Sequence, residues 1–192
     1  MIDIKEYGEF ETAWCPGCGY FPILKTLKEA LGELGLAPHQ FMLFSGIGQA
    51  AKTPHYIKCN ALNGLHGRSL PPATGAHLAN PSMPITVESG DGCSYGEGGN
   101  HFLATLRRNP NITMLVHDNQ IYGLTKGQAS PTTAQGQKTK AQPAGASSMA
   151  FNPIATAVAM KINFVARASA GETEHLKEVI KQAINHKGLS LV

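Results

Sequence analysis

The chain has 192 residues, of which 42% are hydrophobic and 15% are charged, and its formal net charge is +3 at pH 7. This length and hydrophobic content suffice for one α/β domain, expected over residues 1–192, while the small, scattered excess of basic side chains argues against a nucleic-acid partner. No apolar stretch reaches the roughly 18 residues of a membrane helix, and the N-terminus lacks the basic-then-apolar order of a secretory signal, so we expect no membrane association and a cytoplasmic location.

The first half of the chain predicts helices that alternate with short strands. The expected elements are an extended lead-in (1–14), a helix (20–34), a strand (41–44), a short strand with a loop (57–70) and a helix (71–79). In the first helix, apolar residues recur every three or four positions until Gly35, which favours a stop. The last helix begins with Pro71, because proline suits the first helical turn, and further prolines follow it.

The centre of the chain predicts a strand, a turn, a helix and a second strand. The strand 85–87 leads into Gly90-Asp91-Gly92, and a glycine-rich turn precedes a helix over 100–108. The apolar run 112–116 then ends at Asp118-Asn119. Polar residues thus follow the carboxyl ends of both strands, which is where ligands bind in parallel α/β sheets.

The last third predicts a long polar segment, then a helix, a strand and a second helix. Gln128–Ser148 is rich in small and polar residues, which indicates a surface loop that serves as a lid or as an arm contacting a partner. A helix over 153–160, a strand over 164–167 and an amphipathic helix preceded by a Ser169-x-x-Glu172 capping box follow. This alternation argues for one doubly wound parallel sheet flanked by helices.

The oxygens of Asp91 and Asn119 point to a metal ion and a phosphate-bearing ligand. A carboxylate and a carboxamide are hard oxygen donors that suit Mg²⁺, whose shell is completed by phosphates and water. Gly90 and Gly92 allow backbone N–H groups to approach a diphosphate closely. The alternative is a pair of structural turns, because Gly-Asp-Gly and Asp-Asn both favour turns in which the side chain bonds nearby backbone.

Four motifs occur in an order that resembles a known family. The spacing of 28 positions between Asp91 and Asn119 resembles the thiamine diphosphate signature. The β subunits of 2-oxoacid:ferredoxin oxidoreductases are similar to this chain in the segments Trp14–Gly19 (WCPGCG), Ser45–Gly48 (SGIG), Leu65–Arg68 (LHGR) and Asn119–Gln128 (NQIYGLTKGQ). The resemblance covers roughly the whole chain, and it implies the thiamine diphosphate-binding fold.

The resemblance implies a role for each residue that matches the family's motifs. Mg²⁺ would be bound by the side chains of Asp91 and Asn119 and by the backbone carbonyl of Ile121. The residues implied to bind thiamine diphosphate are Ser45, Gly46, Gly48, His66, Gly67, Gly90, Asp91, Gly92, Asn119, Ile121, Tyr122, Gly123, Leu124 and Thr125.

His66, Arg68 and Lys52 are the candidate catalytic side chains. Histidines ordinarily titrate near neutrality, so His66 could donate to a phosphate or handle a substrate proton; its alternative is a hydrogen-bonded structural residue. Arg68 could hold a substrate or diphosphate oxygen through a bidentate contact, or form a surface ion pair. Lys52 could reach the carboxylate of a 2-oxoacid, or remain a solvated surface lysine.

Cys15 and Cys18 lie in a Cys-Pro-Gly-Cys turn, which suits a metal or redox centre in a reducing compartment better than a disulfide. An iron–sulfur cluster, a zinc ion and a pair of small buried residues are the alternatives. The family places a third cysteine where this chain has Gln49 and a fourth beyond residue 192, so a [4Fe–4S] cluster lacks ligands and we expect a truncated sequence. Cys59 is a candidate substitute ligand, and Cys93 is expected to pack beside the cofactor.

The resemblance also implies one half of a two-subunit enzyme. This enzyme would convert a 2-oxoacid to acyl-CoA and CO₂, with thiamine diphosphate as electron sink, coenzyme A as acyl acceptor and ferredoxin as electron acceptor. An α subunit would supply the glutamate that activates the cofactor, since no second domain is predicted here. Two alternatives are a non-oxidative thiamine diphosphate enzyme half, such as a decarboxylase or synthase, and a non-catalytic module that binds zinc or phosphate.

Overall fold

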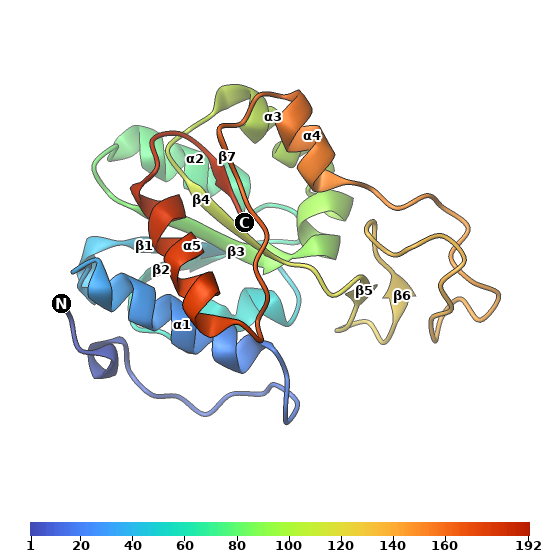
Figure 1. Cartoon of the computed structure of the whole chain (residues 1–192), viewed down its shortest axis with the longest axis horizontal. Coiled ribbons are helices and arrows are strands. Elements are labelled where there is room, and N and C mark those ends of the chain that lie inside the picture. Colours follow the sequence, from blue (N-terminus) through green and yellow to red (C-terminus); the bar gives the residue numbers. More distant parts are fainter.

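The computed structural model describes all 192 residues and centres on a six-stranded sheet (Figure 1). The strand order is β2-β1-β3-β4-β8-β7. The strands are β1 (Met42–Ser45), β2 (Asn60–Asn63), β3 (Ile85–Gly90), β4 (Thr113–His117), β7 (Phe164–Val165) and β8 (Ser190–Leu191). Every neighbouring pair runs parallel, which confirms the predicted sheet.

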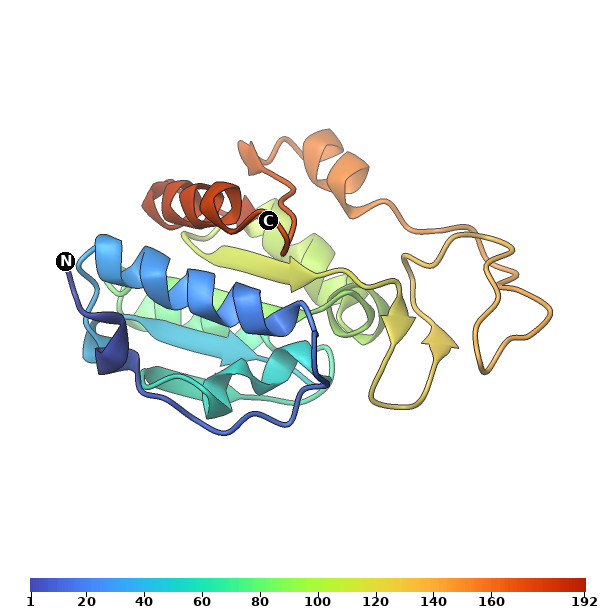
Figure 2. The same cartoon turned by 60° about the horizontal axis from the view of Figure 1, so that its bottom comes forward.

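Helices cover both faces of this sheet. On one face, α1 (Tyr20–Glu33) and α5 (Thr173–Asn185) lie side by side (Figure 1). On the other face lie α2 (Leu70–Ala79) and α3 (Gly99–Arg108), as Figure 2 shows, and α4 (Pro153–Ala159) packs beside β7. Covering both faces with helices is the predicted doubly wound α/β arrangement.

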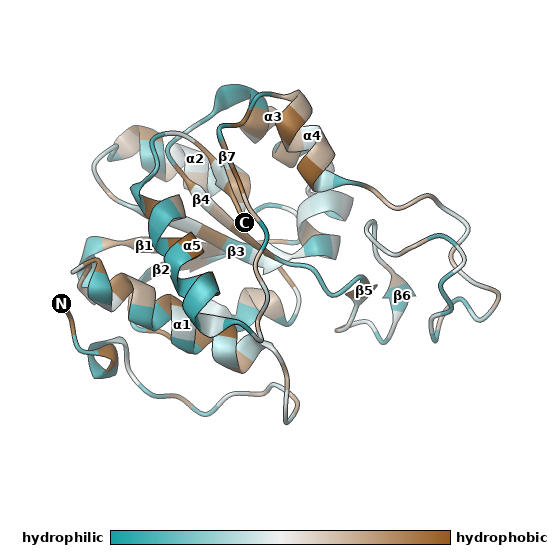
Figure 3. Ribbon diagram, in the orientation of Figure 1, coloured by the Kyte–Doolittle hydropathy of each residue, from teal (hydrophilic) through white to brown (hydrophobic).

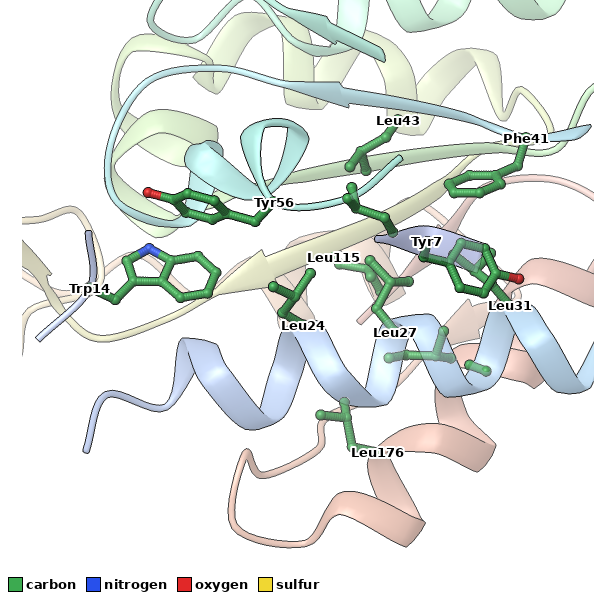
Figure 4. Packing of buried hydrophobic residues seen from close by; sticks show 13 residues of the cluster. Tyr7, Trp14, Leu24, Leu27, Leu31, Phe41, Leu43, Tyr56, Leu115 and Leu176 are labelled. Atoms are coloured by element: carbon green, nitrogen blue, oxygen red, sulfur yellow. The ribbon is translucent and has the colours of Figure 1, made fainter. Parts of the chain in front are cut away.

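Two hydrophobic clusters fill the space between the sheet and the helices. The first lies beneath α1 and α5 and contains Leu27, Leu43 and Leu115 (Figure 4). The second lies on the opposite face and contains Val87 and Phe102. Because both faces of the sheet are covered, the central strand β3 is buried along nearly its whole length. The outer side of α5 is largely hydrophilic (Figure 3), as expected for a helix with one face in water.

Short segments connect the main elements. They are the 3₁₀ helices η1 (Ile4–Tyr7), η2 (Pro38–Gln40) and η3 (Ala50–His55), the π-helical turn η4 (Gly92–Glu97), and the strands β5 (Ile121–Tyr122) and β6 (Gln128–Ala129). β5 and β6 pair antiparallel outside the main sheet. The segment that follows projects away from the sheet (Figures 1 and 2), and we call residues 128–148 the arm. None of the helices combines the length and the hydropathy that crossing a bilayer requires.

The arm is not wholly a surface loop, which corrects part of the prediction. Its outer part, including residues 134–138, is exposed, whereas Ser130, Thr132 and Thr133 at its base are buried. Side-chain hydroxyls make this burial possible, because they supply partners for the polar groups that a loop takes out of water.

Two predictions of local structure at the edges of the molecule are wrong. The lead-in is not extended throughout, because the Asp3 side chain accepts a hydrogen bond from the Lys5 N–H and starts η1. The capping box is absent: α5 begins at Thr173, and the Ser169 hydroxyl accepts a bond from the Gly171 N–H instead. In both places a short polar side chain forms a local turn with its own backbone.

The glycine-rich segment before α3 is not the simple turn that was predicted but the π-helical turn η4, which runs directly into α3. The Gly98 N–H donates to the carbonyl of Cys93, five residues earlier, at 3.0 Å. Gly92 and Gly96 lie against Tyr122: a Cβ atom at Gly92 would collide with its ring, and one at Gly96 with its hydroxyl. The absence of side chains therefore lets an aromatic residue pack closely on this helical turn.

Candidate functional site

The candidate site lies where the order of the strands reverses. β1 is followed in the chain by β2 on one side of it, whereas β3 and β4 follow on the other side. In open α/β sheets, ligands bind beyond the carboxyl ends of the strands at this reversal. A pocket of about 80 Å³ lies there, between the loop after β1, the turn after β3 and the segment after β4.

Most of the predicted site residues come together around this pocket. Those that line it are Gly48, His66, Gly90, Asp91, Gly92, Asn119, Ile121, Tyr122, Gly123, Leu124 and Thr125. Residues that are far apart in the chain thus meet at one edge of the sheet. Tyr20 and Gln49, which the sequence did not single out as cofactor ligands, line the pocket as well.

The other predicted residues are not among those that line the pocket. The hydroxyl of Ser45 is buried and accepts a hydrogen bond from Asn63 at 2.7 Å, and a Cβ atom at Gly67 would collide with the backbone of η4. Arg68 donates to the carbonyl of Glu97 at 3.2 Å rather than to an acidic side chain. Lys52 lies on η3 and is not among the lining residues.

Asp91 is a buried carboxylate, with only 1% of its surface exposed. Burial raises the pKa of its carboxyl above the ordinary value, and hydrogen bonds from Ser130 and Thr132 oppose this rise. None of the salt bridges in the structure involves Asp91, so no cationic side chain neutralises it. A buried charge without a cationic partner is costly, and therefore the carboxylate fits a site for a metal cation.

Asn119 forms the turn that was the alternative to metal binding, and its side-chain oxygen keeps a free lone pair. Its Oδ1 atom accepts the N–H of Ile121 at 3.1 Å, which is the turn expected from Asp-Asn. An amide oxygen has two lone pairs, so one remains for a cation. The side chain is exposed and lies at the pocket with Asp91 and Ile121, so a carboxylate, a carboxamide and a backbone carbonyl are available for Mg²⁺.

Glu97 connects two lining side chains and was not predicted. The Tyr122 hydroxyl lies 3.2 Å from Glu97 Oε2 and 3.3 Å from the carbonyl of Gly92. Burial and then the charge of Glu97 raise the pKa of Tyr122, so this hydroxyl stays protonated. His66 Nδ1 lies 3.3 Å from the same carboxylate, but the two groups are not aligned as a hydrogen bond and Nδ1 has no other partner.

Cys93 packs beside the pocket, as predicted, and joins three loops. Its sulfur accepts the Gly67 N–H at 3.1 Å and the Ile47 N–H at 3.4 Å. A Cβ atom at Gly46 would collide with this sulfur. The thiol therefore holds the loop after β1 and the His66 loop against the turn after β3.

The remaining cysteines do not form a metal cluster. Cys15 is exposed, while Cys18 and Cys59 are partly buried, and no group of three or more histidine, cysteine or acidic side chains could hold a metal. Burial raises the pKa of Cys59 to about 12, which disfavours the thiolate that a metal requires. Two thiolates do not fit a [4Fe–4S] cluster held by four cysteines.

A larger cleft of about 480 Å³ adjoins the pocket between α1, α5 and the end of β4. Its lining is mostly apolar, and it shares Tyr20 and Asn119 with the smaller pocket. His117 lies at its base with Nε2 2.9 Å from the buried carboxylate of Glu88, which also accepts the Thr53 hydroxyl at 2.7 Å. A glutamate within the otherwise uncharged β3 is the sequence signal that could have indicated this buried polar group.

A family model and several known proteins match this chain. Residues 39–192 match the model described as "Thiamine pyrophosphate enzyme, C-terminal TPP binding domain". The 2-oxoacid:ferredoxin oxidoreductase 1 subunit beta of Aeropyrum pernix is 50% identical over 179 residues, which cover 93% of this chain and 56% of that protein. The 2-oxoglutarate synthase subunit KorB of Archaeoglobus fulgidus is 36% identical over 181 residues, or 94% of this chain and 67% of that protein.

A solved structure has the same fold. It is described as a 2-oxoglutarate:ferredoxin oxidoreductase from Magnetococcus marinus with 2-oxoglutarate, coenzyme A and succinyl-CoA bound. The TM-score is 0.96 at 38% sequence identity, and the match covers 100% of this chain and 66% of that one. The present chain thus spans little more than half the length of the Aeropyrum pernix relative and about two thirds of the length of this structure.

Proposed function

This chain belongs to the thiamine pyrophosphate-binding β subunits of the 2-oxoacid:ferredoxin oxidoreductases, and we propose its function on that basis. In this proposal, the pocket at the strand reversal binds the diphosphate end of thiamine diphosphate together with Mg²⁺. The observation that carries it is Asp91, a buried carboxylate that has no cationic side-chain partner and that lines the pocket with Asn119 and Ile121.

The residues of this chain would bind and orient the cofactor. Asp91 and Asn119 would hold Mg²⁺ through side-chain oxygens and Ile121 through its carbonyl, while the backbone of Gly90 and Gly92 would allow the diphosphate to approach. Bound thiamine diphosphate supplies an electron sink for decarboxylation. His66 lies at the pocket beside the carboxylate of Glu97, so it is the side chain best placed to hold or move a proton.

The complete reaction requires further partners. The pocket of about 80 Å³ is far smaller than the roughly 300–1,000 Å³ of typical ligand sites, which supports a site completed by an α subunit. We propose a 2-oxoacid and coenzyme A as substrates and ferredoxin as electron acceptor, which the names of the relatives support. A cytoplasmic location agrees with four free cysteines. Cys15 and Cys18 alone do not fit a four-cysteine cluster, so we assign no electron transfer to this pair.

Calorimetry of thiamine diphosphate binding, with Mg²⁺ and with a chelator, tests the proposal. Asp91→Asn should weaken Mg²⁺-dependent binding at least about 100-fold, because it removes the charge that faces the cation. Asn119→Ala should cost about tenfold, the size expected for one neutral ligand. Glu11→Gln, which alters an exposed carboxylate that does not line the pocket, is the control and should leave binding unchanged. Wild-type affinity in Asp91→Asn would contradict the metal assignment.

A further inference from the structure

The base of the arm contacts both acidic residues that follow the central strands. Thr132 Oγ1 lies 2.6 Å from Asp91 Oδ2, beyond β3, and 2.8 Å from Asp118 Oδ1, beyond β4. Thr132 is 6% exposed and Asp91 is 1% exposed, so solvent contributes little to their contact. A single hydroxyl of the arm therefore joins the ends of two strands.

This hydroxyl cannot satisfy both carboxylates. It carries one proton and can donate it to one oxygen at a time, so the other carboxylate depends on its remaining donors: the Gln120 N–H for Asp118, and Ser130 with the Gly92 backbone for Asp91. The Ser130 hydroxyl lies 3.2 Å from Thr132 Oγ1. Neither Asp91 nor Asp118 takes part in a salt bridge. Two like charges held this close favour the arrival of a cation.

A neighbouring contact attaches the arm to the segment that carries the other proposed ligands. The Thr133 hydroxyl donates to the carbonyl of Gln120 at 2.6 Å and accepts the Ser130 N–H at 2.8 Å. Gln120 lies between Asn119 and Ile121 in the chain. Thr132 and Thr133 thus attach the arm to both sides of the pocket.

We propose that Thr132 is a positioning residue for the metal-binding carboxylate and that it couples the docking of the arm to the binding of a divalent cation. Its hydroxyl holds one oxygen of Asp91 at 2.6 Å and so fixes the orientation of the carboxylate that lines the pocket. A cation at Asp91 in turn offsets the repulsion from Asp118 and strengthens the contact with the arm. Because such coupling is reciprocal, each event stabilises the other by the same free energy. The inference rests on the proposed function.

Calorimetry with Mg²⁺ and thiamine diphosphate tests the positioning role. Thr132→Val keeps the shape and removes the hydroxyl, and should weaken Mg²⁺-dependent binding about tenfold, the effect of one hydrogen bond to a charged group. Thr132→Ser restores the hydroxyl and should bind within about twofold of the wild type. The control is Thr139→Val, which removes a buried arm hydroxyl bonded only within the arm, to the Gln142 N–H, and should bind normally.

Limited trypsin digestion tests the coupling without any activity assay. Lys138 and Lys140 are exposed in the arm, and Mg²⁺ with thiamine diphosphate should slow cleavage there in the wild type and in Thr139→Val. This protection should be lost in Thr132→Val, in which cleavage without ligands should be at least as fast as in the wild type and in Thr139→Val.

Three outcomes separate the two proposals. If the wild type binds the cofactor but the arm gains no protection, the coupling is wrong even where Thr132→Val fails to fold. If Thr132→Val binds and is protected like the wild type, the positioning role is wrong and the proposed function stands. If the wild type shows no Mg²⁺-dependent binding, the proposed function fails and the inference with it.

Discussion

Asp91 is a carboxylate that the fold holds almost completely out of water and supplies with hydroxyl partners but no cationic side chain. Hydroxyls offset only part of the cost of burying a charge, so the ionised form destabilises the protein until a cation binds. Ligand-binding sites are often destabilising in the ligand-free protein, because the ligand supplies the interaction that would stabilise them.

We expect Asp91→Asn to stabilise the metal-free protein at pH 7. Burial raises the pKa of Asp91 above its ordinary value of 3.8, so the folded state favours the protonated carboxyl. The contribution of this carboxyl to stability is therefore present below pH 3.8 and is lost as the pH rises through the higher value of the folded state. The neutral amide does not lose this contribution. Urea denaturation should therefore show that Asp91→Asn has a higher free energy of unfolding than the wild type at pH 7, and that the difference decreases as the pH is lowered.

The matched change Glu11→Gln should show no such gain, because Glu11 is exposed. Equal stabilities of Asp91→Asn and the wild type at pH 7 would mean that the carboxylate is better solvated than its burial suggests. The same variant is expected to lose cofactor affinity, so a gain in stability together with a loss of binding separates a functional cost from a folding defect.

Pattern reasoning could identify Asp91 and Asn119 because each follows an apolar run that predicts a strand. It could not identify Thr132 or Glu97, since their partners are distant in sequence: Thr132 contacts a residue 41 positions away and Glu97 one 25 positions away. Such contacts depend on how loops from different strands meet. The assignments of cofactor ligands stay predictions until binding is measured.

At the scale of elements, η4 and α3 form one continuous helical segment whose first part has wider turns. The joint lies at Gly98, where the backbone passes the carbonyls of Cys93 and Ser94 and the Cα of Gly67. A π-helical turn is rare and is found mostly near functional sites. Here η4 begins at Gly92, which lines the pocket, and leads into α3, which covers the sheet.

Gly98→Ala and Gly99→Ala should therefore have opposite effects. A Cβ atom at Gly98 would lie 2.6 Å from the Cys93 carbonyl oxygen and 2.8 Å from that of Ser94, so we expect a loss of about 1–3 kcal/mol in the free energy of unfolding. A Cβ atom at Gly99 meets nothing within 4 Å, and a helical alanine there should be neutral or stabilising by up to about 1 kcal/mol. Chemical denaturation measures both, and a tolerated Gly98→Ala would contradict the packing at this joint.

The regular elements were predictable because their signals are local. Val87 and Met114 sit in apolar runs long enough for buried strands, and the helices follow from the spacing of apolar residues. The predicted capping box does not form because the Ser169 side chain accepts a hydrogen bond within its own turn. The sequence does not predict η4 because its glycines pack on Tyr122, which lies in another segment. Helix starts and turns are decided by such competition, which single-sequence patterns do not resolve.

At the scale of the whole molecule, the site occupies one open edge of the sheet. A pocket of about 80 Å³ can take an ion and part of a diphosphate, but not a complete coenzyme and substrate. β5 and the arm project from the same edge (Figures 1 and 2), and both residues of β5 line the pocket. This geometry agrees with an active site that closes only when a second subunit covers it.

Expressed alone, the chain should bind thiamine diphosphate weakly and show no turnover, because the wall over the pocket and the residue that activates the cofactor would come from the α subunit. Addition of an α subunit of the same oxidoreductase should increase affinity and give 2-oxoacid- and coenzyme A-dependent reduction of a one-electron dye. Robust turnover by the isolated chain would contradict the two-subunit proposal, and a chain carrying Asp91→Asn with the α subunit is the negative control.

Trp14 is the chain's one tryptophan, is 7% exposed, and packs edge-on against Tyr56 (Figure 4). Its indole N–H donates to the carbonyl of Gln49 at 3.0 Å, and Gln49 lines the pocket. The protein therefore contains a single tryptophan, which is hydrogen-bonded to a loop that lines the pocket. We expect its emission to be that of a shielded indole and to shift when a ligand moves Gln49, so stopped-flow fluorescence could time ligand entry without any label. If saturating ligand leaves the emission unchanged, the loop that contains Gln49 does not move on binding.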